Sequence, residues 1–433
     1  PEGGTSIGTP AAAYSLRNLS TTYTGNVVRV RRDSDDAEQD FTAAQVSDGN
    51  LLSYVNLDTV KGNYTFDSGV DGWTQIAPST VAHNATDDTL QIIVSAGSNS
   101  GALAPDSFFM PNQRHKVSGR IRLNGGDSTL TLRLRTSSTW TYSLVSKTAN
   151  LTSTGGNNGF TITANSTWQD FEFEADTSVA GGANFYIQGL APTADTTVEV
   201  DDIILTQTAG NGFVSKWYDQ SGNDNHAVQT TPANQPKIVD GGSLVSGGID
   251  FDGVDDGLFT ADNFTDTLQS ATIFALTQDD VTSGAASMVR IRPNGTVGTV
   301  DGLLWEKDPN ETYGANTLIE GDNGGVTAAL SGQGTRNTSK NLNTLVYQQS
   351  QILAYENGAL DETLNIVRAG SVPVGDVTLV DQLWIGQNFD DNNRPFNGTM
   401  SEVIVYFTDQ SDNRTAIEAN IGETYGITGI PAY

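Results

Sequence analysis

Apolar and polar residues alternate in short segments along the whole 433-residue chain, and clusters of Gly, Asn, Asp and Ser separate these segments. Residues 90–94, 117–123 and 130–135 are clear examples. Because successive side chains of a strand point to opposite faces, this pattern predicts half-buried β-strands. Residues 124–127, Asn-Gly-Gly-Asp, are typical of a β-hairpin turn. Strands spaced by roughly 8–12 residues predict an all-β protein built from sandwiches.

Acidic residues outnumber basic ones by 51 to 22, which gives a net charge of −29. A field of this sign repels polyanions, so we expect no nucleic-acid partner. No run of about 18 apolar residues occurs, so we expect no membrane insertion. The chain has no cysteine, which favours a bacterial or viral source over a secreted eukaryotic one. No secretion signal is visible at its start.

The pattern changes near residue 57 and divides the chain into two modules. Residues 57–209 form a self-contained series of alternating strands, and residues 1–56 and 210–433 flank it. We predict that the two flanking parts build one discontinuous sandwich. In that sandwich, the strand that holds Val28 should pair in the same sheet as the strand that holds Trp217.

Helical signals are rare. Residues 412–425 form the one segment predicted as a convincing helix, with Ser411 as its N-terminal cap and Gly426 as its C-terminal cap. Residues 51–55 fit either a short helix or a short strand. Residues 1–10 are small and polar, and we predict an extended arm that lies on a neighbouring subunit.

Three stretches resemble the catalytic-type domain of the α-L-arabinofuranosidase B family, which is a concanavalin-like sandwich. They are residues 14–17 with 28–35, residues 217–226 (Trp-Tyr-Asp-Gln-Ser-Gly-Asn-Asp-Asn-His) and residues 385–426. The C-terminal half is also similar to a laminin-G-like domain, at residues 251–256, 355–358 and 400–406. Similar sandwich domains occur in bacteriophage virion proteins and bacterial surface proteins.

The interrupting residues 57–209 resemble a carbohydrate-binding jelly roll of the family 4/9 type. The matching residues are Asn63, Phe66, Asp67, Gly69, Gly72 and Trp73, with residues 200–203 at the end. The termini of a jelly roll lie close together, so insertion into a loop of a host sandwich is sterically easy. The expected fold is therefore all-β, with an inserted jelly roll that interrupts a concanavalin-like sandwich.

This second resemblance implies two kinds of site. It implies a structural Ca²⁺ held by Asp67 and Asp201, because carboxylate oxygens suit this ion; two solvated turn residues are the alternative. Flat aromatic rings suit the C–H faces of sugars, and burial in the core is the alternative for each ring. The candidate glycan-binding residues are Trp140, Tyr142, Trp168 and Tyr186.

The first resemblance implies a pair of catalytic carboxyl groups, an Asp acid and a Glu nucleophile. At the position of the acid the chain carries Asn388, which cannot protonate a leaving group. Asp390 and Asp391 lie at least two residues away, and Glu306 is the local carboxylate of the right type for the nucleophile. We therefore expect no catalytic residues.

Two further polar stretches have a structural and a functional interpretation. Residues 218–223 could be a polar binding loop, but a buried turn held by side-chain hydrogen bonds is preferred, with His226 in a structural role. Asp252, Asp255 and Asp256 lack EF-hand spacing and are most simply a turn at the end of a strand.

These observations favour a non-catalytic protein that binds a glycan or a cell-surface polysaccharide. We expect a bacteriophage virion component, such as a capsid decoration protein, a tail fibre or a tail-associated adhesin. Its partners would then be other virion proteins, in a homo-oligomer or larger assembly. The alternatives are a secreted arabinofuranosidase-like glycoside hydrolase, with the insert as its targeting module, and a bacterial surface adhesin.

Overall fold

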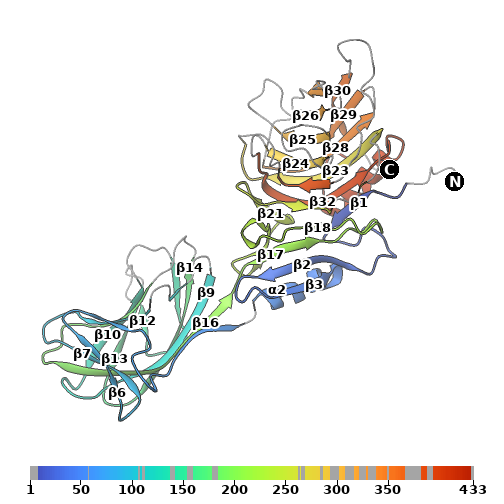
Figure 1. The fold of residues 1–433 in the computed structure, drawn as a ribbon. Helices are drawn as coiled ribbons and strands as arrows, with labels where there is room; N and C mark the ends of the chain where they lie inside the picture. The colour runs from blue at the N-terminus through green and yellow to red at the C-terminus, as the bar shows by residue number, and fades with distance from the viewer. Residues whose placement is uncertain are drawn as a thin grey trace.

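A computed structural model shows a protein built almost entirely of antiparallel strands (Figure 1). It describes residues 8–430 except 57, 106–107, 110–112, 137–141, 154–158, 178–183, 262–263, 265–268, 283–285, 293–301, 308–315, 321–327, 330–337, 349–350, 366–381 and 388–393. Within these residues, none of the helices has the length and apolar character needed to cross a membrane.

The middle of the chain forms two sheets of its own, which we call the insert. One sheet has the strand order β12-β13-β10-β15-β8-β5, and the other β11-β14-β9-β16-β7-β6 with β4 also paired to β16. The strands are β4 Thr59–Tyr64, β5 Thr74–Ile76, β6 Thr80–Asn84, β7 Thr89–Val94, β8 Gly101–Leu103, β9 Gln113–Leu123, β10 Leu130–Thr136, β11 Tyr142–Ser146, β12 Thr152–Ser153, β13 Gly159–Ala164, β14 Gln169–Thr177, β15 Phe185–Gly189 and β16 Thr196–Ala209.

The inward residues of the two insert sheets form one core. Phe171 and Phe173 come from β14, whereas Phe160 and Phe185 come from the opposite sheet, and all four side chains are buried. The ring centroids of Phe173 and Phe185 lie 5.8 Å apart. This two-layer core is that of a β-sandwich, as the alternating sequence pattern predicts.

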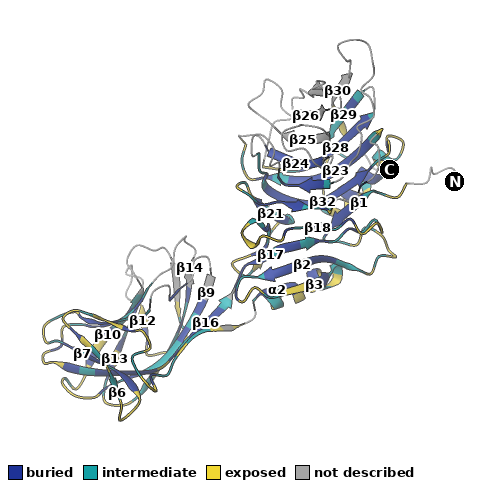
Figure 2. Ribbon diagram, in the orientation of Figure 1, coloured by how far each residue is buried: buried dark blue, intermediate teal, exposed yellow. Residues whose placement is uncertain are grey.

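The rest of the chain forms the host sandwich. Its elements are β1 Ala12–Ser15, β2 Asn26–Arg32, β3 Glu38–Thr42, α1 Ala43–Ser47, α2 Asn50–Val55, β17 Gly212–Trp217, β18 Ala227–Val228, a 3₁₀ helix Pro232–Asn234, β19 Lys237–Asp240, β20 Ser243–Leu244, β21 Ile249–Asp252, β22 Leu258–Phe259, β23 Ser270–Asp279, β24 Ala286–Arg292, β25 Gly302–Lys307, β26 Asn316–Glu320, β27 Ala328–Ala329, β28 Lys340–Gln348, β29 Gln351–Glu356, β30 Ala359–Asn365, β31 Gln382–Ile385, β32 Asn397–Tyr406 and α3 Arg414–Tyr425. Strands β23 and β32 are buried along most of their length (Figure 2).

The two ends of the chain meet in the host sandwich. Strand β1 pairs with β32, with Ala12 opposite Val405. Strand β2 pairs with β17, with Val28 opposite Trp217, which confirms the predicted pairing. The all-β fold with an inserted jelly roll is thus the observed one, while the boundaries at residues 56/57 and 209/210 stay a prediction.

The predicted hairpin at residues 124–127 is wrong. Strands β9 and β10 on either side of it belong to different sheets of the insert. Asn124 N–H donates to Thr197 O over 2.9 Å, and Gly125 O accepts from Thr197 N–H over 3.0 Å. Because Gly125 and Gly126 have φ of 122° and 91°, the turn can carry the chain across the edge of the sandwich.

The helix predictions are partly confirmed. Helix α3 ends at Gly426 with φ of 68°, as expected of a C-terminal cap. Ser411 does not cap it, because Ser411 N–H and Oγ are bound to Asp409 Oδ1 in a preceding turn, and Asn413 takes the cap position. Helix α1 was not predicted, although its capping box of Thr42 and Gln45 is readable in the sequence.

Candidate binding site

The outer face of the insert's larger sheet carries alternating acidic and basic side chains. Along β9, Val117 and Ile121 point into the core, so Ser118 and Arg120 point outward. Arg120 lies opposite Asp201 of β16 on one side and Asp170 of β14 on the other. The pairing of strands therefore places one guanidinium group between carboxylates from two distant parts of the sequence.

A hollow of about 380 Å³ lies in this face, and we call it the insert hollow. A register shift of β16 between Asp201 and Ile204 leaves Asp202 at φ of 50° on its rim. The lining combines three carboxylates and one guanidinium group with small hydroxyl side chains. Its residues are Ser118, Gly119, Arg120, Thr148, Asp170, Phe171, Glu172, Asp202 and Ile204.

The charged groups of this face are bound to one another. Arg120 binds Asp201, and its Nε lies 3.1 Å from Asp202 Oδ2. The hydrogen bond to Asp201 raises the pKa of Arg120. Beside it, the fully buried Glu199 accepts from Arg122 Nε over 2.7 Å and from the amide nitrogens of Asn84 and Asn124. Such a network of hydrogen bonds and ion pairs orients the exposed donors and acceptors at its edge.

Of the predicted aromatic residues, Trp168 lies beside the insert hollow. It is half-buried, and the guanidinium carbons of Arg120 and Arg122 both lie 4.7 Å from its ring centroid. Tyr186 lies on β15 in the other sheet, so the structure does not bring it together with Trp168. Trp140 and the side chain of Tyr142 lie outside the described part of the chain.

The predicted Ca²⁺ ligands have different surroundings. Asp201 is 5% exposed and binds Arg120 through Oδ2, while its Oδ1 accepts from Asp202 N–H over 2.8 Å. Asp67 is exposed and accepts from Thr65 Oγ1 over 3.0 Å. The calcium site on these two residues stays a prediction.

A cluster of three carboxylates lies at the end of β21, in the turn that the sequence predicts. The ligand oxygens of Asp252, Asp255 and Asp256 all lie within 4.8 Å of one another, so these residues could hold a hard cation. Asp252 Oδ1 accepts from Val254 N–H over 2.8 Å. Burial, followed by repulsion from Asp252, raises the pKa of Asp256 to about 7.

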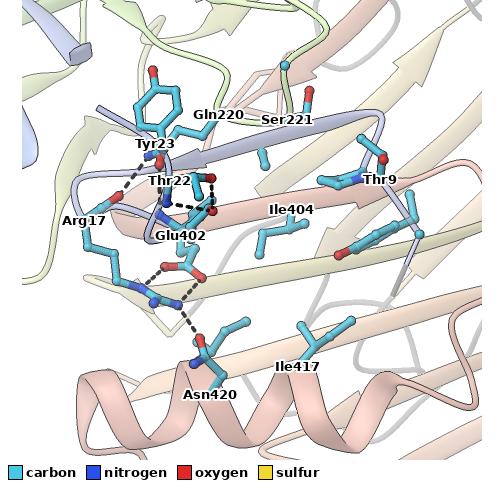
Figure 3. Close-up of a pocket in the computed structure, with 18 of the residues that line it drawn as sticks. Thr9, Arg17, Thr22, Tyr23, Gln220, Ser221, Glu402, Ile404, Ile417 and Asn420 are labelled. Atoms are coloured by element: carbon cyan, nitrogen blue, oxygen red, sulfur yellow. Dashed lines mark hydrogen bonds and ion pairs between the residues drawn. The ribbon is translucent and has the colours of Figure 1, made fainter. Parts of the chain in front are cut away.

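A second hollow, of about 730 Å³, lies where the N-terminal and C-terminal parts of the chain meet (Figure 3). We call it the terminal hollow. The buried Glu402 of β32 accepts from Arg17 Nε over 2.8 Å and from Ser15 Oγ over 3.0 Å. Arg17 Nη2 also donates to Asn420 Oδ1 of α3 over 2.9 Å. Sequence reasoning missed this network because Ser15 and Arg17 precede Glu402 by 387 and 385 positions.

Residues 218–223 form a turn held by side-chain hydrogen bonds, as preferred from the sequence, although Asp219 alone of the six is buried. The 3% exposed Asp219 accepts from the backbone N–H groups of Ala13, Ser221 and Asn225 over 2.8 to 3.0 Å. His226 Nδ1 accepts from Asp219 N–H over 3.1 Å, and burial lowers the pKa of this histidine. These bonds fasten the turn to β1, which gives Asp219 a structural role, while Gln220, Ser221 and Gly222 line the terminal hollow.

The positions that bear on catalysis lie outside the described residues. This holds for Asn388, Asp390 and Asp391. It also holds for the side chain of Glu306, whose backbone lies on β25 opposite Ser287. The expectation of a non-catalytic chain therefore stays a prediction.

No family model and no curated protein matches this chain. Solved structures similar to part of this chain include the CBM40 of the Ruminococcus gnavus IT-sialidase bound to α2,3-sialyllactose. The two sequences are 21% identical, the match covers 34% of this chain and 80% of that chain, and the TM-score is 0.29. The CBM22-1 xylan-binding domain of Paenibacillus barcinonensis Xyn10C has 14% identity, coverages of 35% and 96%, and a TM-score of 0.27. Trypanosoma rangeli sialidase has 17% identity, coverages of 45% and 29%, and a TM-score of 0.31. Sequence identities and TM-scores this low do not indicate what the chain binds.

Proposed function

We propose that this protein is a non-catalytic glycan-binding protein, and that the insert hollow holds a neutral, hydroxyl-rich sugar. The observation that carries the proposal is the lining of that hollow. A sugar hydroxyl both donates and accepts a hydrogen bond. The carboxylates of Asp170, Glu172 and Asp202 can accept from hydroxyls, and the guanidinium group of Arg120 can donate to them.

The setting we propose is the outer surface of a virion. Its support is the sequence resemblance of the host sandwich to domains of bacteriophage proteins, and a secreted or cell-surface protein is the alternative setting. Many copies displayed on one particle would bind a polysaccharide with avidity, even if each hollow binds a sugar weakly. Partners in such an assembly would be further copies of this chain and other virion proteins.

Replacing Glu172 by glutamine is expected to weaken glycan binding about tenfold. The change removes the charge from one acceptor in the lining, and a hydrogen bond to a charged group contributes about 1.5–3 kcal/mol. A change of about 1.4 kcal/mol corresponds to a factor of ten in Kd. The measurement is a neutral-glycan array to identify the sugar, followed by titration calorimetry with that sugar.

Glu174→Gln is the matched control for this experiment. Glu174 follows two residues later on the same strand, pairs with Lys147 over 3.0 Å and does not line the insert hollow. Its variant should bind like the wild type. Equal affinities of the wild type and Glu172→Gln, or no neutral glycan bound by the wild type, would contradict the proposal.

We also propose the Ca²⁺ site in the insert, as the jelly-roll resemblance implies. Asp201 Oδ1 would be the ligand atom on β16, because Oδ2 faces Arg120. A chelator is then expected to lower the Tm of the insert, since a ligand that binds only the folded state stabilises it. The shift in Tm should vanish in Asp67→Asn and persist in Asp252→Asn. A wild-type Tm that a chelator does not change would contradict the calcium site.

A further inference from the structure

The outer face of the insert's smaller sheet carries two neighbouring arginines. On β10, Leu132 and Leu134 point into the core and are at most 1% exposed, so Arg133 and Arg135 point outward. Arg133 lies opposite Gln188 of β15 and Thr161 of β13. Two residues along a strand span about 7 Å, so one bound group can reach both guanidinium groups.

Among the described residues, these two arginines have no carboxylate partner, unlike several other arginines of the chain. In the part of the chain that the structure describes, neither Arg133 nor Arg135 makes an ion pair, and the Nε of each is buried without a hydrogen-bond partner. Among the described residues, arginines that pair with a carboxylate include Arg17, Arg29, Arg31, Arg32, Arg120, Arg122 and Arg414. With 51 acidic residues against 22 basic ones, a carboxylate partner would be easy to supply. Two adjacent unpaired cations therefore point to an external anion.

The surroundings of the two arginines suit a sugar that carries an acidic group. The guanidinium carbon of Arg135 lies 4.9 Å from the ring centroid of Tyr186, which orients the planar guanidinium group. Tyr186 lies opposite Arg135 on β15, and Gly159, opposite it on β13, places no side chain there. The polar side chains of Thr161 and Gln188 flank the pair and can meet hydroxyl groups.

We propose that Arg133 and Arg135, with Tyr186, bind the carboxylate or sulfate group of an acidic glycan. Arginine presents N–H groups in a fork that matches the oxygens of such groups. The site lies on the opposite sheet from the insert hollow and does not depend on it. At physiological salt the negative field of the rest of the chain is screened beyond about 8 Å, so the local pair dominates.

The test uses three probes with one neutral core: lactose, 3′-sulfolactose and 3′-sialyllactose. Titration calorimetry with the full chain should show binding of both acidic sugars and at least tenfold weaker binding of lactose. Arg133→Gln and Arg135→Gln should each lower the affinity for the acidic sugars about tenfold. Lys147→Gln, which removes one positive charge from the other sheet, should leave it unchanged.

Two further measurements keep the result interpretable. Arg135→Lys keeps the charge but loses the fork, so we expect an affinity between those of the wild type and Arg135→Gln even if a neutral variant folds poorly. Equal binding of lactose and the acidic sugars, or unchanged affinity in both glutamine variants, would overturn the site. If hexaglutamate at the same concentration displaces the acidic sugars, the site on Arg133 and Arg135 binds acidic peptides instead. If the acidic sugars do not bind at Arg133 and Arg135, the proposal that the insert hollow binds a neutral sugar still stands.

Discussion

Replacing Glu402 by alanine is expected to lower the free energy of unfolding by about 3 kcal/mol. The Glu402 side chain is 1% exposed and accepts from Arg17, Ser15 and Tyr425. Removing one partner of a buried ion pair costs about 3–5 kcal/mol, and the lower end applies here because Arg17 is 24% exposed. Denaturant unfolding of wild type and variant measures the difference.

The same change should also alter the titration of Tyr425. Burial, followed by the negative charge of Glu402, raises the pKa of Tyr425 to about 12, so its pKa should fall in the variant. Asp240→Ala is the control, because the Lys237–Asp240 pair is exposed and should contribute less than about 1 kcal/mol. A loss in Glu402→Ala no greater than in this control would contradict the prediction.

Between about pH 4 and pH 7, the free energy of unfolding is expected to fall as the pH rises. An unfolded aspartate has a pKa of about 3.9, whereas that of Asp256 in the folded chain is about 7. In this window the folded state holds a proton that the unfolded state has lost. Stability therefore decreases by up to about 1.4 kcal/mol per pH unit from this residue. Asp250 adds to the slope, since burial and Asp280 raise its pKa to about 6.

Asp256→Asn should flatten this dependence and stabilise the protein at pH 8 by about 2 kcal/mol or more, because an amide carries no charge to desolvate. Urea unfolding at a series of pH values measures the slope. A chelator must be present, because a cation bound by Asp252, Asp255 and Asp256 would keep them ionised. Parallel curves for wild type and variant would refute the assignment to Asp256.

The strands could be predicted because their signal is local. The segments 90–94, 117–123 and 130–135 lie within β7, β9 and β10. The hairpin prediction at the Asn-Gly-Gly-Asp turn was wrong because its residues specify positive φ but not which sheet the next strand enters. That choice depends on Thr197, about 70 positions away, whose backbone holds the turn.

The candidate site could be predicted less well than the fold. Trp168 was identified as an aromatic candidate, but the insert hollow beside it depends on pairing that no local pattern encodes. Arg120 meets Asp201 across 81 positions, and the register shift next to Asp201 decides which residue faces the hollow. That Arg133 and Arg135 have no carboxylate partner among the described residues likewise emerges only from the paired strands.

The pairing of β1 with β32 also sets the order in which the chain can fold during synthesis. Ser15 and Glu402, which bind each other across this pair, are separated by 387 positions. At about 5–20 residues per second, a ribosome needs on the order of 20–80 s to make that length. Strand β1 therefore waits for its partner, while the described strands of the insert pair only with one another and can form earlier. The jelly roll would then act as an early folded block that keeps the two halves of its host together until the last strand arrives.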